Sequence, residues 1–152
     1  MSVVAGVIDH LSTRLEALAP PDRRSITYHR LEGKQAAGAE TWMARGFQVG
    51  LPTLIEVSLE NAAVRLTRWA FDLIVVFDQT GRGVHELPTA ISDELALISA
   101  HINSIVDWPA STEVVFVDSA EVVEGEVDGT DHLLRFMVQA DTWEAAAPGE
   151  NT

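Results

Sequence analysis

The chain has 152 residues, no cysteine, 47% hydrophobic residues and a net charge of −13. This length can bury a core unaided, and the lack of cysteine excludes a disulfide scaffold, a thiolate metal site and a cysteine nucleophile. The first 21 residues mix charged with apolar side chains and have no basic leader, so we expect neither a signal peptide nor a membrane span. We expect one domain over residues 1–143 and a flexible C-terminal tail over residues 144–152.

The charge is unevenly distributed along the chain. Residues 1–82 hold nine basic and nine acidic residues, whereas residues 83–152 hold fourteen carboxylates and a single basic residue, Arg135. Six of these carboxylates lie between Asp118 and Asp131. Such a block repels phosphate, so we expect no sequence-specific DNA binding. Two interpretations stay open: a solvated acidic loop, or a negative wall that a polyanion passes without adhering.

Two segments show helical periodicity, one over about residues 2–19 and the other over about residues 88–106. Their apolar stripes recur at steps of three and four residues: Val4, Ile8, Leu11, Leu15 and Leu18 in the first, and Ile91, Leu95, Ile98, Ile102 and Ile105 in the second. Pro20 and Pro21 end the first segment, and Pro88 suits the first turn of the second. Each stripe is shorter than three heptads, which favours packing on a sheet over a coiled coil.

Period-two patterns predict strands over residues 25–31, 64–77, 113–117 and 132–140, with an extension through Val122-Val123 as an alternative. The second of these is apolar on both faces in its later half, so we expect it at the centre of a sheet. Residues 54–59 are expected to be its partner strand, with a helix as the alternative. The element order predicts an α+β fold: a mixed or mostly antiparallel sheet with two helices packed on one face.

The last two strands are predicted to form a hairpin that turns at Asp128-Gly129. We expect its carboxylates to form an acidic surface, made of Glu121, Glu124, Glu126, Asp128 and Asp131.

Short motifs give no sign of catalysis. The histidines lack metal-site spacing, and no serine lies in a GxSxG turn. The turn at residues 80–83 lacks the phosphate-loop patterns, and the tip at Asp128 has oxygen donors for weak calcium binding but no EF-hand spacing. We therefore predict no catalytic residue, metal or cofactor.

A long arm is predicted over about residues 32–52, and it contains Trp42, Met43, Arg45 and Phe47. Loops of this length are usually functional or mobile, and aromatic, Met and Arg side chains are enriched where partners bind. We predict these four residues as subunit or partner contacts, with core packing as the alternative for Trp42 and Phe47. A basic, aromatic arm and an acidic hairpin would let identical subunits meet head to tail and close a ring.

The order of these segments resembles the tail terminator (tail completion) proteins of tailed bacteriophages. The likeness spans an N-terminal helix ending in Pro, the arm, the strand RLTRWAFDLIVVF, the helix ISDELALISAHINSIVDW and the closing DHLLRFMVQADTW. It rests on size and element order, because the family shares no invariant signature, and the long acidic tip is a departure from its pattern.

The resemblance implies a non-enzymatic ring, commonly a homohexamer, with its helices on the outside. In the virion such a ring caps the tail tube at the head-proximal end and joins it to the head-tail connector or stopper protein. DNA would pass through it without sequence-specific binding, no membrane would be involved, and assembly would occur in the host cytoplasm. The alternatives are a small cytosolic ligand- or protein-binding module, and an enzyme that uses scattered carboxylates and His132.

Overall fold

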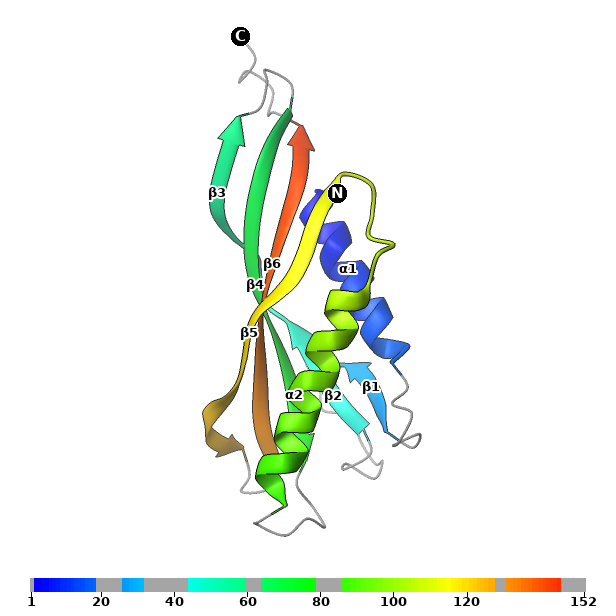
Figure 1. The fold of residues 1–152 in the computed structure, drawn as a ribbon, viewed down its shortest axis with the longest axis vertical. Helices are drawn as coiled ribbons and strands as arrows, with labels where there is room; N and C mark the ends of the chain where they lie inside the picture. Colours follow the sequence, from blue (N-terminus) through cyan, green and yellow to red (C-terminus); the bar gives the residue numbers. More distant parts are fainter. Residues whose placement is uncertain are drawn as a thin grey trace.

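The computed structural model describes residues 2–18, 26–31, 44–59, 64–78, 86–127 and 131–145. Within these ranges, two helices and six strands form the fold (Figure 1). The helices are α1 (Val3–Glu16) and α2 (Leu87–Ser104), and the strands are β1 (Thr27–Arg30), β2 (Ala44–Val49), β3 (Thr53–Leu59), β4 (Val64–Asp78), β5 (Thr112–Val127) and β6 (Asp131–Ala145).

All six strands belong to one mixed sheet with the order β1-β2-β4-β6-β5, and β3 also pairs with β4. β1 and β2 are parallel, whereas the other pairs are antiparallel. β4 lies at the centre because it pairs with β6 over its whole length and, on its other side, with β3 in its first half and β2 in its second. Both helices lie on the same side of the sheet (Figure 1), which confirms the predicted α+β fold.

We call the side of the sheet under the helices the covered face. Alternate residues of β4 and β6 point to it, in agreement with the period of two along a strand. These residues are almost fully buried: Phe71, Leu73, Val75 and Phe77 in β4, and Leu134, Phe136, Val138 and Ala140 in β6. They pack against apolar residues of the helices, which include Val7, Leu11, Leu15, Ile98 and Ile102.

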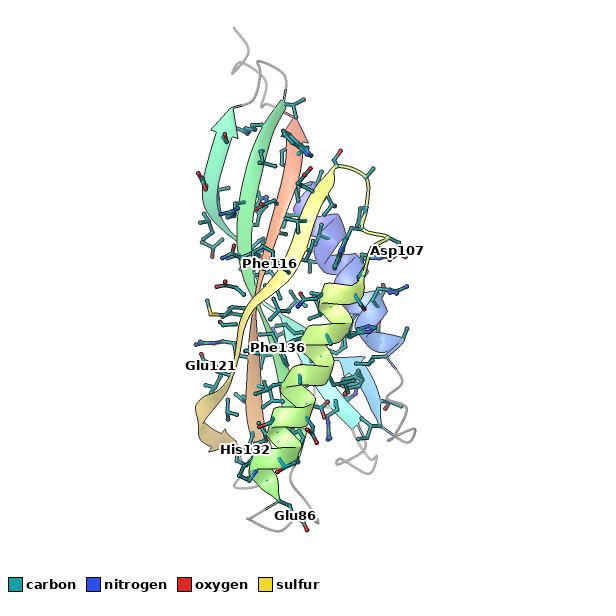
Figure 2. The ribbon with its side chains drawn as sticks, in the orientation of Figure 1. Glu86, Asp107, Phe116, Glu121, His132 and Phe136 are labelled. Carbon is teal, nitrogen blue, oxygen red and sulfur yellow. The ribbon has the colours of Figure 1, made fainter. Side chains whose placement is uncertain are left out.

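The opposite side, which neither helix covers, is the open face. The residues that alternate with the core residues point to it, among them Asp72 and Ile74 of β4 and Arg135 and Met137 of β6. Figure 2 shows the contrast on neighbouring strands, with Phe136 beside α2 and Glu121 on the other side of the sheet.

The two helices follow their predicted stripes. Ser2 caps α1, since its hydroxyl accepts a hydrogen bond from the Ala5 amide, and Pro88 occupies the first turn of α2. Both helices are slightly shorter than predicted, because each predicted range includes the turn that leaves the helix.

Three boundaries differ from prediction. The arm predicted over residues 32–52 contains a strand, β2, and only residues 32–43 of it lie outside the described residues. β5 and β6 are longer than predicted, because they continue pairing to Val127 and Asp131 at the tip of the hairpin. β6 also runs to Ala145, so its pairing with Val64 orders the first two residues of the predicted tail.

Candidate interaction surfaces

A buried cluster of polar side chains joins the sheet to α2 on the covered face. Arg45 and Glu94 are both 0% exposed, and their Nη2 and Oε2 atoms lie 3.5 Å apart. The Tyr28 hydroxyl donates a hydrogen bond to Oε1 of Glu94, and the Arg45 guanidinium lies 4.5 Å above the ring of Phe77. Because water is excluded, each charge depends on its partners for compensation. The cluster is closed to solvent, which suits a structural role.

The burial of Arg45 and Phe47 contradicts their prediction as contact residues. Arg45 and Phe47 point into the core from β2, where Phe47 is 1% exposed and lies opposite Val75. In the single chain, neither side chain is accessible to another molecule. For Phe47, the alternative prediction of core packing is confirmed. Trp42 and Met43 lie outside the described residues.

The predicted acidic hairpin is described in part. Glu121 is exposed on β5 and accepts a hydrogen bond from the Arg135 guanidinium across the strand pair. Its charge is therefore partly compensated. Asp128 and the side chains of Glu124, Glu126 and Asp131 lie outside the described residues.

β3 forms an exposed apolar edge of the sheet. In the described part of the chain it pairs with β4 alone, so the backbone groups on its other side are open to pairing. Leu54, Ile55 and Val57 are 49%, 54% and 42% exposed, and Glu56 lies between them. Soluble proteins normally protect such an edge with charges, proline or a covering element, because an open edge is a template for another strand.

A groove of about 370 Å³ opens on the sheet beside this edge. It lies where β2 passes into β3, because Val49 pairs with Leu73 while Thr53 pairs with Ala70. The three residues between them thus lie opposite only two residues of β4, and this irregularity bends the strand. The groove is lined mainly by apolar side chains, by two carboxylates and by small polar groups, including Leu51, Ile55, Met137, Asp72, Asp118 and Gln139.

An ion-pair network flanks the groove on the open face. The Arg68 Nε and Nη2 atoms donate hydrogen bonds of 2.9 and 3.1 Å to the two carboxylate oxygens of Asp141, and Glu56 lies 3.9 Å from Nη1. The hydrogen bonds and the charge of Asp141 raise the pKa of Arg68 above its ordinary value. This bidentate geometry fixes the Arg68 fork on the sheet.

Within the described ranges, no three His, Cys, Asp or Glu side chains gather in a way that could hold a metal ion. His132 is half-buried at the start of β6, opposite Phe77. No helix among the described residues is long and apolar enough to cross a bilayer.

The fold and its exposed surfaces define an α+β protein with an open sheet edge and an uncovered sheet face. No protein-family model matches the sequence, and no curated protein matches it.

Three features of these surfaces were not predicted from the sequence. Glu94 lies on the buried side of α2, three residues after the core residue Ile91, and was not predicted as a member of the cluster. Phe47 and Val49 alternate as in a strand, but Arg45 at the preceding inward position interrupts this pattern in β2. Asp72 stood out as a charge within an apolar strand.

Proposed function

We propose that this protein is a structural subunit that assembles with copies of itself through the edges of its sheet and forms a ring. The observation that carries the proposal is β3, an edge strand whose apolar side chains are exposed in the single chain. Burying such side chains stabilises an assembly by about 25 cal/mol for each Å² of apolar surface removed from water. A second copy offers the simplest cover.

A second edge strand, β5, provides a complementary surface. It is 16 residues long, and in the described part of the chain it pairs with β6 alone. Val114 and Val122 on it are 40% and 36% exposed. Joining β3 of one copy to β5 of the next uses two different surfaces, so the contact is head to tail, and successive contacts close a ring when the rotation permits.

The resemblance to phage tail terminators supplies the setting for this ring. Under the proposal, six copies cap the tail tube and join it to the head-tail connector, and DNA passes through the opening. The excess of acidic residues after position 83 supports a passage without adhesion, because a negative lining repels the phosphate backbone. We propose no catalytic role, since the buried cluster of Tyr28, Arg45 and Glu94 is inaccessible to a substrate.

The test is the oligomeric state of the purified chain. We expect rings with an open centre in negative-stain images and a matching mass in sedimentation at micromolar concentration. Assembly should strengthen as salt rises from about 50 to 500 mM, because each copy carries a net charge of −13 that salt screens. A chain that stays monomeric throughout would overturn the proposal.

Two matched substitutions locate the contact. Val57→Lys places a charge on the β3 edge, outside the groove, and should abolish assembly while the circular dichroism spectrum stays unchanged. Val106→Lys places the same charge on a residue that is 91% exposed in the connection between α2 and β5, and should leave assembly intact. Equal effects of both variants would contradict the proposed edge contact.

A small binding module is the second candidate, and the groove beside β3 favours it. Discrete monomers or dimers without an open centre would support this alternative over the ring.

A further inference from the structure

Charged side chains on the open face lie in successive rows across the strands. In one row, Arg68 is held by Asp141 and Glu56. In another, nearer the tip of the hairpin, Arg135 is paired with Glu121. Each of these rows thus contains a cation that is paired with a carboxylate.

A row between them contains carboxylates and, within the part of the chain that the structure describes, no cation. Asp72 lies on β4 opposite Met137, and Asp118 is the extra residue of a bulge in β5 beside the same residue. Among the described residues, neither carboxylate makes an ion pair or a side-chain hydrogen bond. Both line the groove, and no Lys, Arg or His lines it with them.

The walls of the groove are suited to the stem of a long side chain. Met137 and Ile55 are 38% and 54% exposed along it, and Leu51, at 91% exposed, stands beside it. Its volume of about 370 Å³ lies at the lower end of the range of ligand pockets, which is enough for one large side chain and its neighbours. The groove therefore combines an apolar wall with an uncompensated negative charge.

We propose that this groove binds an arginine side chain presented by a different protein, with the guanidinium on Asp72 and Asp118 and the stem along Met137 and Ile55. Arginine fits better than lysine, because its planar fork can donate to two carboxylates and its guanidinium is more weakly hydrated than an ammonium group. Its aliphatic stem can pack on the apolar walls. The exposed apolar Leu51 favours a protein segment over a free amine. A basic partner is favoured because it complements the net charge of −13 that this chain carries. The two carboxylates lie on the open face, whereas the ring contact proposed above joins copies through the strand edges.

The proposal can be tested without knowing the partner. The probe is the capped tripeptide acetyl-Leu-Arg-Val-amide, and its control is the same peptide with citrulline, which keeps the shape and removes the charge. In heteronuclear NMR titrations of the full chain, we expect the arginine peptide to bind with a dissociation constant of about 1 mM, typical of so small a ligand. The shifted amides should be those of Gly50, Asp72, Asp118 and Gln139.

Substitution of each carboxylate distinguishes binding of the peptide in the groove from a general attraction of a cationic peptide to an acidic protein. Asp72→Asn and Asp118→Asn should each weaken binding by about tenfold, as expected for the loss of a charged hydrogen-bond acceptor. Asp93→Asn, on an exposed position of α2, removes the same charge elsewhere and should leave binding unchanged. Asp118 is exposed, so its variant keeps the test valid even if Asp72→Asn impairs folding.

Three outcomes would overturn this proposal: equal shifts with the citrulline peptide, shifts that spread outside the groove, or equal weakening by Asp93→Asn. Loss of self-association in Asp72→Asn would also overturn it, because the occupant would then be a second copy. Salt separates this site from the ring contact, since peptide binding should weaken as salt rises whereas assembly should strengthen. Either proposal can thus fail while the other stands.

Discussion

The covered face and the open face of the sheet both carry charged side chains, but they compensate them differently. On the covered face, the charge of Arg45 meets that of Glu94 inside the chain, and Tyr28 completes the cluster. On the open face, Asp72 and Asp118 have no cation among the described residues. Buried charges must be compensated within the fold, whereas charges at a groove can be left for a partner. This difference separates residues that hold the chain together from residues available for binding.

The largest effect is expected from removing one partner of the buried cluster. Glu94→Ala leaves the Arg45 charge buried without compensation, which should lower the free energy of unfolding by about 3–5 kcal/mol. Chemical denaturation at neutral pH measures this loss. The double variant Arg45→Met, Glu94→Leu is the control, because it removes both charges and should recover most of the stability. A loss below about 1 kcal/mol in Glu94→Ala would show that the cluster is not the internal compensation described above.

Substitutions of two neighbouring residues of β6 allow a direct comparison of how much each face contributes to stability. Phe136 is 0% exposed on the covered face, and Met137 is 38% exposed on the open face. Phe136→Ala should cost about 3–5 kcal/mol, because it leaves a cavity in the core, whereas Met137→Ala should cost less than about 1 kcal/mol. Urea denaturation of both variants checks this. Similar losses would indicate that something covers the open face.

The strand that organises the sheet could be predicted from sequence because its signal is local. β4 shows apolar alternation from Trp69 to Phe77 and a second apolar face in its later half, which is typical of a central strand. The two helices were predicted for the same reason, since an apolar stripe is visible within one segment.

β2 could not be found in this way. Arg45 occupies an inward position of β2 where the pattern demands an apolar residue, and this position is stable only because Glu94 compensates it. Glu94 lies 49 positions further along the chain, and Tyr28 lies 66 positions before Glu94. Interactions over such separations depend on the tertiary fold, so the cluster and the pairing of β2 were not visible in any local window.

The groove was hidden for a related reason. Asp72 is visible in the sequence as a charge within the apolar half of β4. Its lack of a cation among the described residues depends on which residues of β5 and β6 lie beside it. The register that pairs Arg68 with Asp141 and leaves Asp72 opposite Met137 appears only in the folded sheet.

The smallest effect concerns the rim of the covered face, where a surface interaction ties the helices together. Asp107, in the connection after α2, accepts a hydrogen bond of 3.3 Å from Nε2 of His10 in α1, and Arg14 of the same helix lies 3.6 Å away. Figure 2 shows Asp107 beside α1. The hydrogen bond from His10, with a further contribution from Arg14, lowers the pKa of Asp107 below its ordinary value of 3.8.

This lowered pKa gives the sign of a pH dependence. Because the folded chain binds a proton on Asp107 less readily than the unfolded chain, the stabilisation is complete above the ordinary pKa and is lost as the pH falls through the lowered value. Asp107→Asn should therefore reduce Tm at pH 7, by less than about 4 °C for so exposed a group, and the difference from the wild type should shrink at pH 2–3. Thermal unfolding followed by circular dichroism at both pH values measures it. A difference that persists at acid pH would mean that the Asp107 contact acts through packing and not through charge. The rim would then resemble the core beneath it, whose apolar contacts do not depend on pH.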